Sequence, residues 1–264
     1  EDLVDSRTTE LTANNNTPYT WFWMDLRKGP LVLEVPPKVL GLIDDMWYRW
    51  NADIGITGPD KGAGGKYLLL PPGYKDAVPD GYHVVRSPTY QTWAGWRTFL
   101  VDGDAKPGVA AVKQYTKIYP LAQAGKPPPA LNFVNMSGKP FNMVAPADES
   151  FWPMLHQVVQ EEPTDTIDAT TLGIWASIGI EKGKPFAPDA RMKKILAEAA
   201  AVGDATGRAV AYRTRDKEAF FFEDRQWKRP FIGSYKFEKQ PGVPNLDAAV
   251  MFFFLATGVT PAMD

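Results

Sequence analysis

The chain has 264 residues, of which 44% are hydrophobic and 23% are charged, with a formal net charge of −2. These values are typical of a globular protein that buries its core in one large domain or two modest ones. The charge provides no basic stripe for nucleic acid. The absence of cysteine excludes disulfides, thiolate nucleophiles and cysteine metal sites. No apolar run approaches the ~18 residues of a membrane span, so we expect neither a nucleic-acid partner nor a span.

The N-terminal part has the pattern of antiparallel strands. Residues 1–16 are polar and are expected to form a flexible lead-in. In residues 19–25, Tyr19, Trp21 and Trp23 fall on one face of a strand and Thr20, Phe22 and Met24 on the other, so a strand here is apolar on most of both sides. An Arg-Lys-Gly-Pro turn follows, and residues 31–35 form the returning strand, which predicts a β-hairpin. Residues 38–50 have apolar residues at helical spacing, which predicts a short amphipathic helix with Asp44 and Asp45 facing water.

Further strands are predicted at 66–70, 82–87 and 93–101, and 107–121 is typical of a helix or a pair of turns. The proline run at 126–129 indicates a linker, so we place a boundary between an antiparallel β domain, 17–125, and a helical or irregular region, 126–264. Helices are predicted at 150–160 and at 188–202, the second with Gly203 as its stop. The fold class is therefore mixed and β-rich: an antiparallel β-sandwich-like N-terminal part followed by a more helical C-terminal part.

Residues 53–74 contain six glycines and then change abruptly into a strand. The spacing rejects a P-loop, because Asp60 stands where its first glycine belongs and Tyr67 where its magnesium-binding hydroxyl belongs. A dinucleotide fingerprint fails because two prolines, and not a helix, follow the strand. Two interpretations remain: an ordered β-loop that needs glycine for its backbone, or a loop over the rim of a ligand pocket with Asp53, Asp60 and Lys66 as its polar groups.

Few residues in the sequence are candidates for a catalytic role. The two histidines, His83 and His156, lie far apart in the sequence, which excludes a histidine-rich metal site, and both suit structural positions. No serine lies in a Gly-x-Ser-x-Gly elbow, and residues 102–104 are more typical of a turn than of a calcium loop. Paired carboxylates stay open, with Asp53 and Asp60 as the catalytic candidates. We predict no metal and no cofactor.

The aromatic content is more informative: the chain has nine Trp, ten Tyr and fourteen Phe residues. Most rings are expected in the core, while some could line a ligand-binding cleft. The candidate ligand-binding residues combine rings with cationic groups: Lys66, Tyr67, Arg86, Tyr90, Trp93 and Arg97.

Several motifs resemble one known family. They include Thr17-Pro-Tyr-Thr-Trp21, Glu34-Val-Pro-Pro37, Gly58-Pro-Asp60, Gly64-Gly-Lys-Tyr-Leu-Leu-Leu-Pro-Pro-Gly-Tyr74 and Gly81-Tyr-His-Val-Val-Arg-Ser-Pro-Thr-Tyr90. Residues 14–125 resemble the domain of unknown function 1254, which is usually followed by the domain of unknown function 1214. The resemblance implies sandwich-like domains and an exported protein, periplasmic or secreted, without its signal peptide. It supplies no established catalytic residues.

The resemblance leaves three functional hypotheses. The first is an enzyme or enzyme half that acts on a small organic or carbohydrate ligand in an aromatic-lined pocket. The second is a non-catalytic ligand-binding module. The third is an interaction protein completed by a DUF1214-like domain on a separate chain or a cleaved remainder, or by a second copy in a homo-oligomer. Region 227–264, which contains the apolar stretch at 246–255, is expected to pack against such a partner.

Overall fold

The computed structural model describes residues 7–9, 16–136, 138–142, 144–229, 238–240 and 243–250. It divides into two compact units. The main segments of the first are Asn14–Ser137 and Glu161–Thr166, and those of the second are Gly138–Gln160 and Ile167–Asp264. The division at 137/138 lies later than the predicted boundary at 125/126. Most of the predicted lead-in at 1–16 falls outside the described residues.

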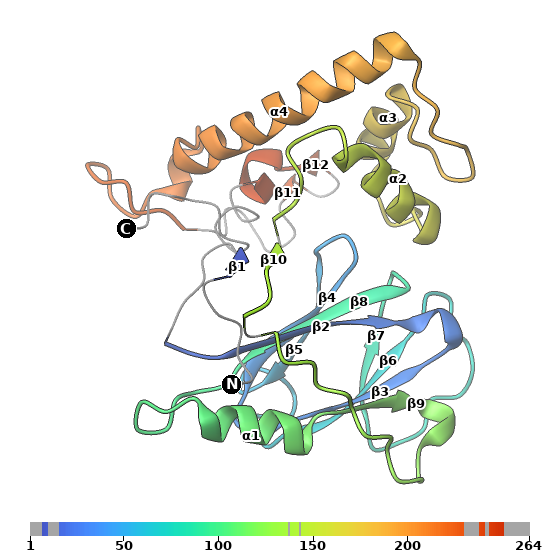
Figure 1. Cartoon of the computed structure of the whole chain (residues 1–264), viewed down its shortest axis with the longest axis vertical. Helices are drawn as coiled ribbons and strands as arrows, with labels where there is room; N and C mark the ends of the chain where they lie inside the picture. Colours follow the sequence, from blue (N-terminus) through green and yellow to red (C-terminus); the bar gives the residue numbers. More distant parts are fainter. Residues whose placement is uncertain are drawn as a thin grey trace. The chain divides into compact units, whose positions relative to one another are not determined.

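The first unit contains two four-stranded sheets (Figure 1). The first sheet is antiparallel throughout, in the order β2 (Tyr19–Asp25), β8 (Gln91–Arg97), β4 (Leu40–Asp45) and β5 (Trp50–Gly55). The second sheet has the order β7 (His83–Arg86), β6 (Gly65–Leu70), β3 (Leu31–Val35) and β9 (Lys117–Pro120). Only β6 and β7 run parallel among these pairs.

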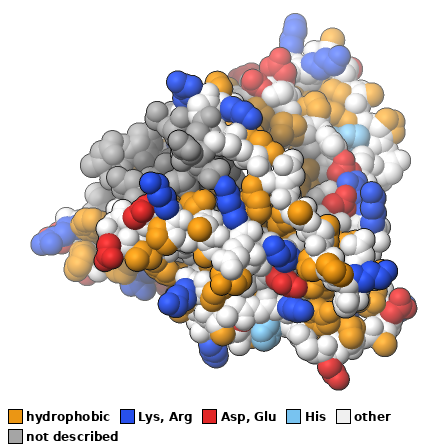
Figure 2. Space-filling view, turned by 60° about the horizontal axis from the view of Figure 1, so that its bottom comes forward, with side chains coloured by type: hydrophobic (Ala, Val, Ile, Leu, Met, Phe, Trp, Pro, Cys, Tyr) orange, Lys and Arg blue, Asp and Glu red, His pale blue; other side chains and the backbone are white. Residues whose placement is uncertain are grey.

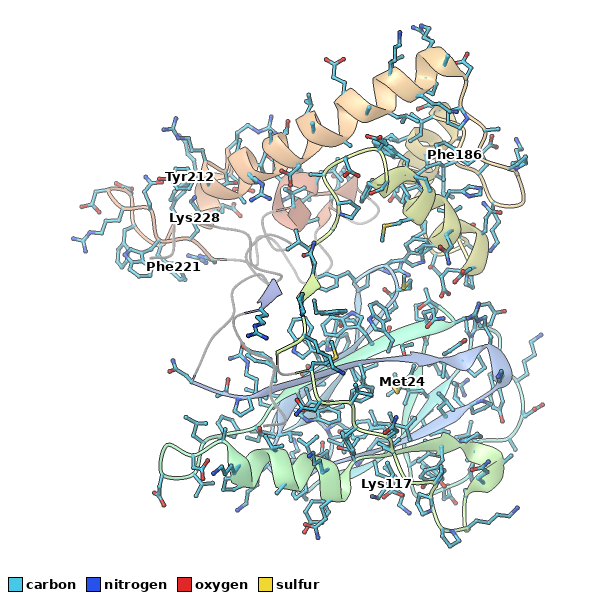
Figure 3. All side chains as sticks on the ribbon, in the orientation of Figure 1. Met24, Lys117, Phe186, Tyr212, Phe221 and Lys228 are labelled. Atoms are coloured by element: carbon cyan, nitrogen blue, oxygen red, sulfur yellow. The ribbon has the colours of Figure 1, made fainter. Side chains whose placement is uncertain are left out.

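The core of this unit lies between the two sheets. Met24, Ile43 and Trp96 enter it from the first sheet, and Leu33 and Tyr67 enter it from the second (Met24 is labelled in Figure 3). The helix α1 (Lys106–Tyr115) adds Val112 to the same cluster. Each fully buried large side chain contributes roughly 1.5–3 kcal/mol of burial free energy. The predicted β-sandwich-like N-terminal part is confirmed.

The second sheet is covered on its other face as well. Val32, Leu68, Leu70 and Tyr119 form a second buried cluster with side chains from residues 74–82 and from the 3₁₀ turn η2 (Leu121–Gln123) and Ala124. A strand buried on both faces has a nearly continuous apolar sequence, as β3 and β6 do. This explains why the run at 67–70 is uniformly apolar.

The predicted hairpin at 19–35 is wrong, although both of its strands exist. The strands β2 and β3 belong to different sheets. Between them the 3₁₀ turn η1 (Leu26–Lys28) is capped by Asp25, which accepts from the backbone N–H of Arg27, and Leu26 is fully buried. The turn thus carries the chain from one sheet to the other, with the Leu26 side chain buried inside it.

The predicted helix at 38–50 is also wrong, because that segment contains strand β4, the turn after it and the first residue of β5. The side chains that fit helical spacing also fit a strand pair, and pairing with β8 decides between the two. Asp44 and Asp45 are buried and do not face water. Asp45 organises the β4–β5 turn by accepting from the backbone N–H groups of Trp47 and Arg49, and it forms a 2.7 Å ion pair with the Arg49 guanidinium.

The later predictions for the first unit are mostly confirmed. Strands at 65–70 and 83–86 lie within one residue of the predicted ranges, while the strand predicted at 93–101 lies at 91–97 and ends four residues earlier. Within the predicted helix or turns at 107–121 the structure has α1 and then β9. Residues 102–104 form a tight turn bridged by Val101 and Asp104, as expected for a turn.

The second unit is helical, as predicted. Its elements are α2 (Phe151–Glu161), α3 (Ala169–Ser177), α4 (Ala190–Tyr212), the 3₁₀ turn η3 (Lys217–Ala219), the parallel pair of β1 (Thr8–Thr9) with β10 (Phe141–Asn142), and the antiparallel pair of β11 (Glu238–Gln240) with β12 (Val243–Pro244). The predicted helix at 150–160 is confirmed as α2. None of the described helices is both long and apolar enough to cross a membrane.

Side chains connect these helices. The Trp152 indole donates to the carbonyl of Leu196 at 2.8 Å. At the other end of α4, the Lys228 ammonium donates to the carbonyls of Ala211 and Tyr212 and lies 5.4 Å from the Tyr212 ring centre (Figure 3). Burial lowers the pKa of Lys228. The lysine thus caps the carbonyl end of α4, where a positive charge is favourable.

The start predicted for the second long helix is confirmed, and its stop is wrong. Asp189 caps α4 by accepting from the backbone N–H of Met192 at 2.7 Å. The helix continues through Gly203 to Tyr212. A glycine inside a helix lowers its stability without ending it when the flanking residues favour the helix, as the alanines around Gly203 do.

Replacing Gly203 with Ala is expected to raise the free energy of unfolding by about 0.5–1 kcal/mol. A methyl group at this position meets no heavy atom within 4 Å, so no clash opposes the gain. Chemical unfolding of both proteins measures the difference. The matched control is Gly125→Ala, where space is equally open but φ is +83°, and a loss of stability is expected there.

Candidate functional site

The outer face of the first sheet is lined by aromatic side chains. Along β2, Phe22 and Met24 point into the core, so alternation places Tyr19, Trp21 and Trp23 on the opposite face. Across the ladder Trp23 pairs with Trp93 of β8. We call the following residues the aromatic face: Tyr19, Trp21, Trp23, Tyr48, Trp50 and Trp93.

The rings of this face contact one another in a row. The Trp21 ring centre lies 5.9 Å from that of Tyr19 and 5.7 Å from that of Trp93. Tyr48 stacks on Trp93 at 5.5 Å with an interplanar angle of 13°. The Arg97 guanidinium lies 5.0 Å from the Tyr19 ring centre and ends the row. Such contacts order the rings beyond what their burial alone provides.

Gly95 has no side chain, which leaves space for two of these rings to lie close to the surface of the sheet. It sits on the outer face of β8, directly opposite Trp21. A Cβ atom at this position would lie 2.9 Å from Cζ3 of Trp93 and 3.8 Å from Cδ1 of Trp21. Any other residue would displace the Trp93 ring, while Trp21 would stay in ordinary van der Waals contact, so glycine allows Trp93 its place in the row.

Several rings of the face are open to solvent. Trp21 is 38% exposed, Trp23 59% and Trp50 50%. Exposure alone does not single out this face, because other hydrophobic side chains also reach the surface among Lys and Arg residues (Figure 2). The aromatic face differs in having a row of four rings in mutual contact, which come from β2, β8 and the turn between β4 and β5.

Two carboxyl groups lie on the same side of the sheet. Asp44 pairs with Trp93 on β8 and with Trp50 on β5, and Asp53 pairs with Leu42. Asp53 accepts from the Trp50 indole N–H at 3.1 Å. Asp44 is only 5% exposed, and its Oδ1 atom is buried without a hydrogen-bond partner.

This environment changes the acidity of Asp44. Burial, followed by the charges of Asp45 and Asp53, raises the pKa of Asp44 to about 7. Burial and the nearby Asp44 charge likewise raise the pKa of the Tyr48 hydroxyl. Tyr48 also has a φ of +61°, which is uncommon for a residue with a large side chain. A carboxyl group that changes charge near neutral pH among exposed rings is typical of functional sites.

The structure separates the other predicted site residues from this face. Asp60 lies inside the glycine-rich loop, where it accepts from the backbone N–H groups of Gly55 and Gly64 and from the Tyr67 hydroxyl. Lys66 belongs to the second sheet, with its ammonium 3.6 Å from the Glu34 carboxylate. The glycine-rich segment is therefore an ordered loop held together by Asp60.

The predicted cationic and aromatic ligands are also divided. Arg86 lies on β7 of the second sheet and donates to the Tyr74 carbonyl at 3.5 Å. The backbone N–H of Tyr90 donates to the buried carboxylate of Glu162 at 2.6 Å, and burial raises the pKa of that carboxyl. Of the predicted set, the structure brings Asp53, Trp93 and Arg97 together on one face.

The histidines occupy structural positions. His83 lies against the Tyr67 ring at 5.0 Å between ring centres. His156 Nε2 is 2.9 Å from the Lys184 carbonyl, and its ring stacks on Phe186. Within the described ranges, no three His, Asp or Glu residues group in a way that could hold a metal ion.

Sequence reasoning missed Asp44, Tyr48 and Trp50, since all three stood in the predicted helix. It did place Tyr19, Trp21 and Trp23 on one side of a strand. The signal for the others is their position one to five residues from Asp45, which closes the turn between β4 and β5.

The fold is similar to that of a solved structure. The crystal structure of the VPA0106 protein from Vibrio parahaemolyticus has 20% sequence identity to the chain and a TM-score of 0.60. The match covers 96% of this chain and 60% of that protein, so the chain spans less than two thirds of its length. A search of the curated proteins found no match. The model of the DUF1254 family, described as a protein of unknown function, matches residues 1–120, the part of the chain that contains the motifs resembling this family.

Proposed function

We propose that the chain binds a saccharide on the aromatic face of the first sheet. The observation that carries the proposal is the row of contacting rings from Tyr19 through Trp21 and Trp93 to Tyr48, with exposed indoles beside it. Sugar rings present apolar C–H faces that pack on aromatic rings, while their hydroxyls need a few fixed polar groups.

The polar groups around the rings suit this ligand class. Asp53 and Asp44 offer carboxyl oxygens to sugar hydroxyls, and Arg97 offers donors at the other end of the row. A charged ligand fits less well, because two acidic groups and one guanidinium stand on the same face. The chemistry therefore favours a neutral ligand with alternating apolar and hydroxyl-bearing edges.

Replacing Trp93 with Ala is expected to weaken saccharide binding at least ten-fold, equivalent to about 1.4 kcal/mol. Trp93 is the ring that both Trp21 and Tyr48 contact, so its loss breaks the row in the middle. Calorimetric titration with cellotriose and with triacetylchitotriose measures the affinity. The matched control is Trp227→Ala, at an exposed indole outside the first unit. If the natural chain binds neither of the two trisaccharides, the proposal is contradicted.

A second candidate function is acid–base catalysis on the same ligand class. It is favoured by the pKa of about 7 of Asp44, which burial raises and which makes the protonated carboxyl available as a proton donor near neutral pH. Asp53 would then be the second carboxyl group of the pair. Release of reducing sugar by the natural chain, lost in Asp44→Asn and kept in Asp76→Asn, would support catalysis.

The export expected from the family resemblance stays a prediction. Cell fractionation of the natural host, followed by detection of the chain in the periplasm or the medium, tests it. The expectation that region 227–264 packs against a partner domain falls largely outside the described residues.

A further inference from the structure

We propose that the saccharide carries an acetamido group, whose N–H and carbonyl oxygen are recognised by Asp44 and Asn51. This inference rests on the proposed function. It names the ligand class for the same face, and it follows from an irregularity in the pairing of β4 with β5.

The irregularity is a bulge. Ile43 pairs with Ala52 and Asp44 pairs with Trp50, so Asn51 is the additional residue on β5. Ile43 lies in the core and Ala52 packs against it. Alternation therefore places Asn51 on the outer side, next to Asp44. Bulges commonly re-aim a side chain at a functional site.

Both side chains have an unused polar atom. Oδ1 of Asp44 and Nδ2 of Asn51 are buried, and neither has a hydrogen-bond partner. A buried polar atom without a partner costs about 1–3 kcal/mol, so a ligand that satisfies both atoms recovers that cost on binding. One atom accepts when Asp44 is ionised, and the other donates.

A secondary amide complements this pair. In a trans amide the N–H and the carbonyl lie on opposite edges of one plane. The amide would therefore lie between the two side chains, its N–H donating to the carboxylate oxygen and its carbonyl accepting from the amide nitrogen. A hydroxyl can donate to the carboxylate oxygen or accept from the amide nitrogen, so a hydroxyl fits either atom, whereas the acetamido group presents one fixed donor and one fixed acceptor. The methyl group of an acetamido substituent also needs an apolar neighbour, and Trp50 pairs directly with Asp44.

The ligand must displace the side chain that covers these atoms. Tyr48 is the candidate, because it lies near enough to Asp44 to sense its charge and stacks on Trp93 in the short turn between β4 and β5. That turn holds Tyr48 at a φ of +61°. We expect the Tyr48 ring to swing off Trp93 when the amide enters.

Calorimetric titration of the whole chain with triacetylchitotriose and with cellotriose tests the inference. These trisaccharides share their linkage and differ in the acetamido groups. We expect at least ten-fold tighter binding of triacetylchitotriose. A ten-fold ratio corresponds to about 1.4 kcal/mol. In Asn51→Ala the ratio of the two affinities is expected to fall below about two, because the amide that donates to the acetamido carbonyl is gone. Asn132→Ala, at an exposed asparagine, should keep the full ratio.

The outcomes separate the two proposals. Equal affinities for both trisaccharides in the natural chain overturn the acetamido inference and leave saccharide binding standing. Binding of neither trisaccharide overturns both. A preference that persists in a folded Asn51→Ala, or in Asn51→Ser should the alanine variant not fold, assigns the preference to other residues and overturns the role of Asn51.

Discussion

Replacing Asp44 with Asn is expected to stabilise the protein at pH 8 by on the order of 4 kcal/mol and to change its stability little at pH 4. The reason is the cost of ionising a buried carboxyl group that has an unpaired oxygen. Asparagine has nearly the same shape and carries no charge, so it removes this cost.

The sign follows from the two pKa values of the carboxyl. Burial raises the pKa of Asp44 in the folded chain to about 7, above its ordinary value of 3.8. Between those values the folded state binds more protons than the unfolded state, so the free energy of unfolding falls as pH rises. The loss is complete above pH 7 and absent below the unfolded pKa.

Urea unfolding at pH 4, 6 and 8 measures the effect. The control is Asp76→Asn, the same chemical change at an exposed position. The difference in stability between Asp44→Asn and the natural chain should grow with pH, while that for Asp76→Asn should stay flat. If the difference in the free energy of unfolding between Asp44→Asn and the natural chain does not change with pH, ionisation of the Asp44 carboxyl does not destabilise the folded state.

The strands of the first unit were largely predictable from local sequence, because prolines and glycines separate short apolar runs. Their pairing was not. The segments 19–25 and 31–35 look like a hairpin, yet Leu26 is buried within the turn and sends the chain to the other sheet. The hydrophobic pattern of a segment indicates which side chains share a face of the strand, but it does not indicate which other strand pairs with it.

The site was predictable only in the parts that lie on clear strands. Asp53, Trp93 and Arg97 share a face because β4, β5 and β8 are neighbours, and Lys66 and Arg86 lie elsewhere because β6 and β7 belong to the other sheet. Asp44 could not be predicted as a site residue, because the helical spacing of residues 38–50 placed its side chain on the solvent-facing side of a helix. Its raised pKa arises from burial and then from the charges of Asp45 and Asp53, and the pairing of β4 with β8 that contributes to this burial joins residues distant in sequence.

Replacing Asp60 with Ala is expected to lower the free energy of unfolding by about 3–6 kcal/mol, a large share of the 5–15 kcal/mol that stabilises a typical domain. The Asp60 carboxylate accepts from the backbone N–H of Gly55 at 2.7 Å, from that of Gly64 at 3.1 Å and from the buried hydroxyl of Tyr67. The substitution leaves all three donors without an acceptor. Burial and this hydrogen bond raise the pKa of Tyr67, so its hydroxyl stays a donor.

The loop around Asp60 has no easy way to relax after this change. Gly55 and Gly64 adopt φ values of +75° and +78°, and a Cβ at Gly55 would lie 2.0 Å from the Val39 carbonyl oxygen. Thermal and urea unfolding of Asp60→Ala measure the loss, with Asp76→Ala as the exposed control. Asp60→Asn keeps one acceptor oxygen and should fall between the two. A variant Asp60→Ala within about 1 kcal/mol of the natural chain, less than the cost of one buried unpaired donor, would mean that the glycine backbone and not the carboxylate holds this loop.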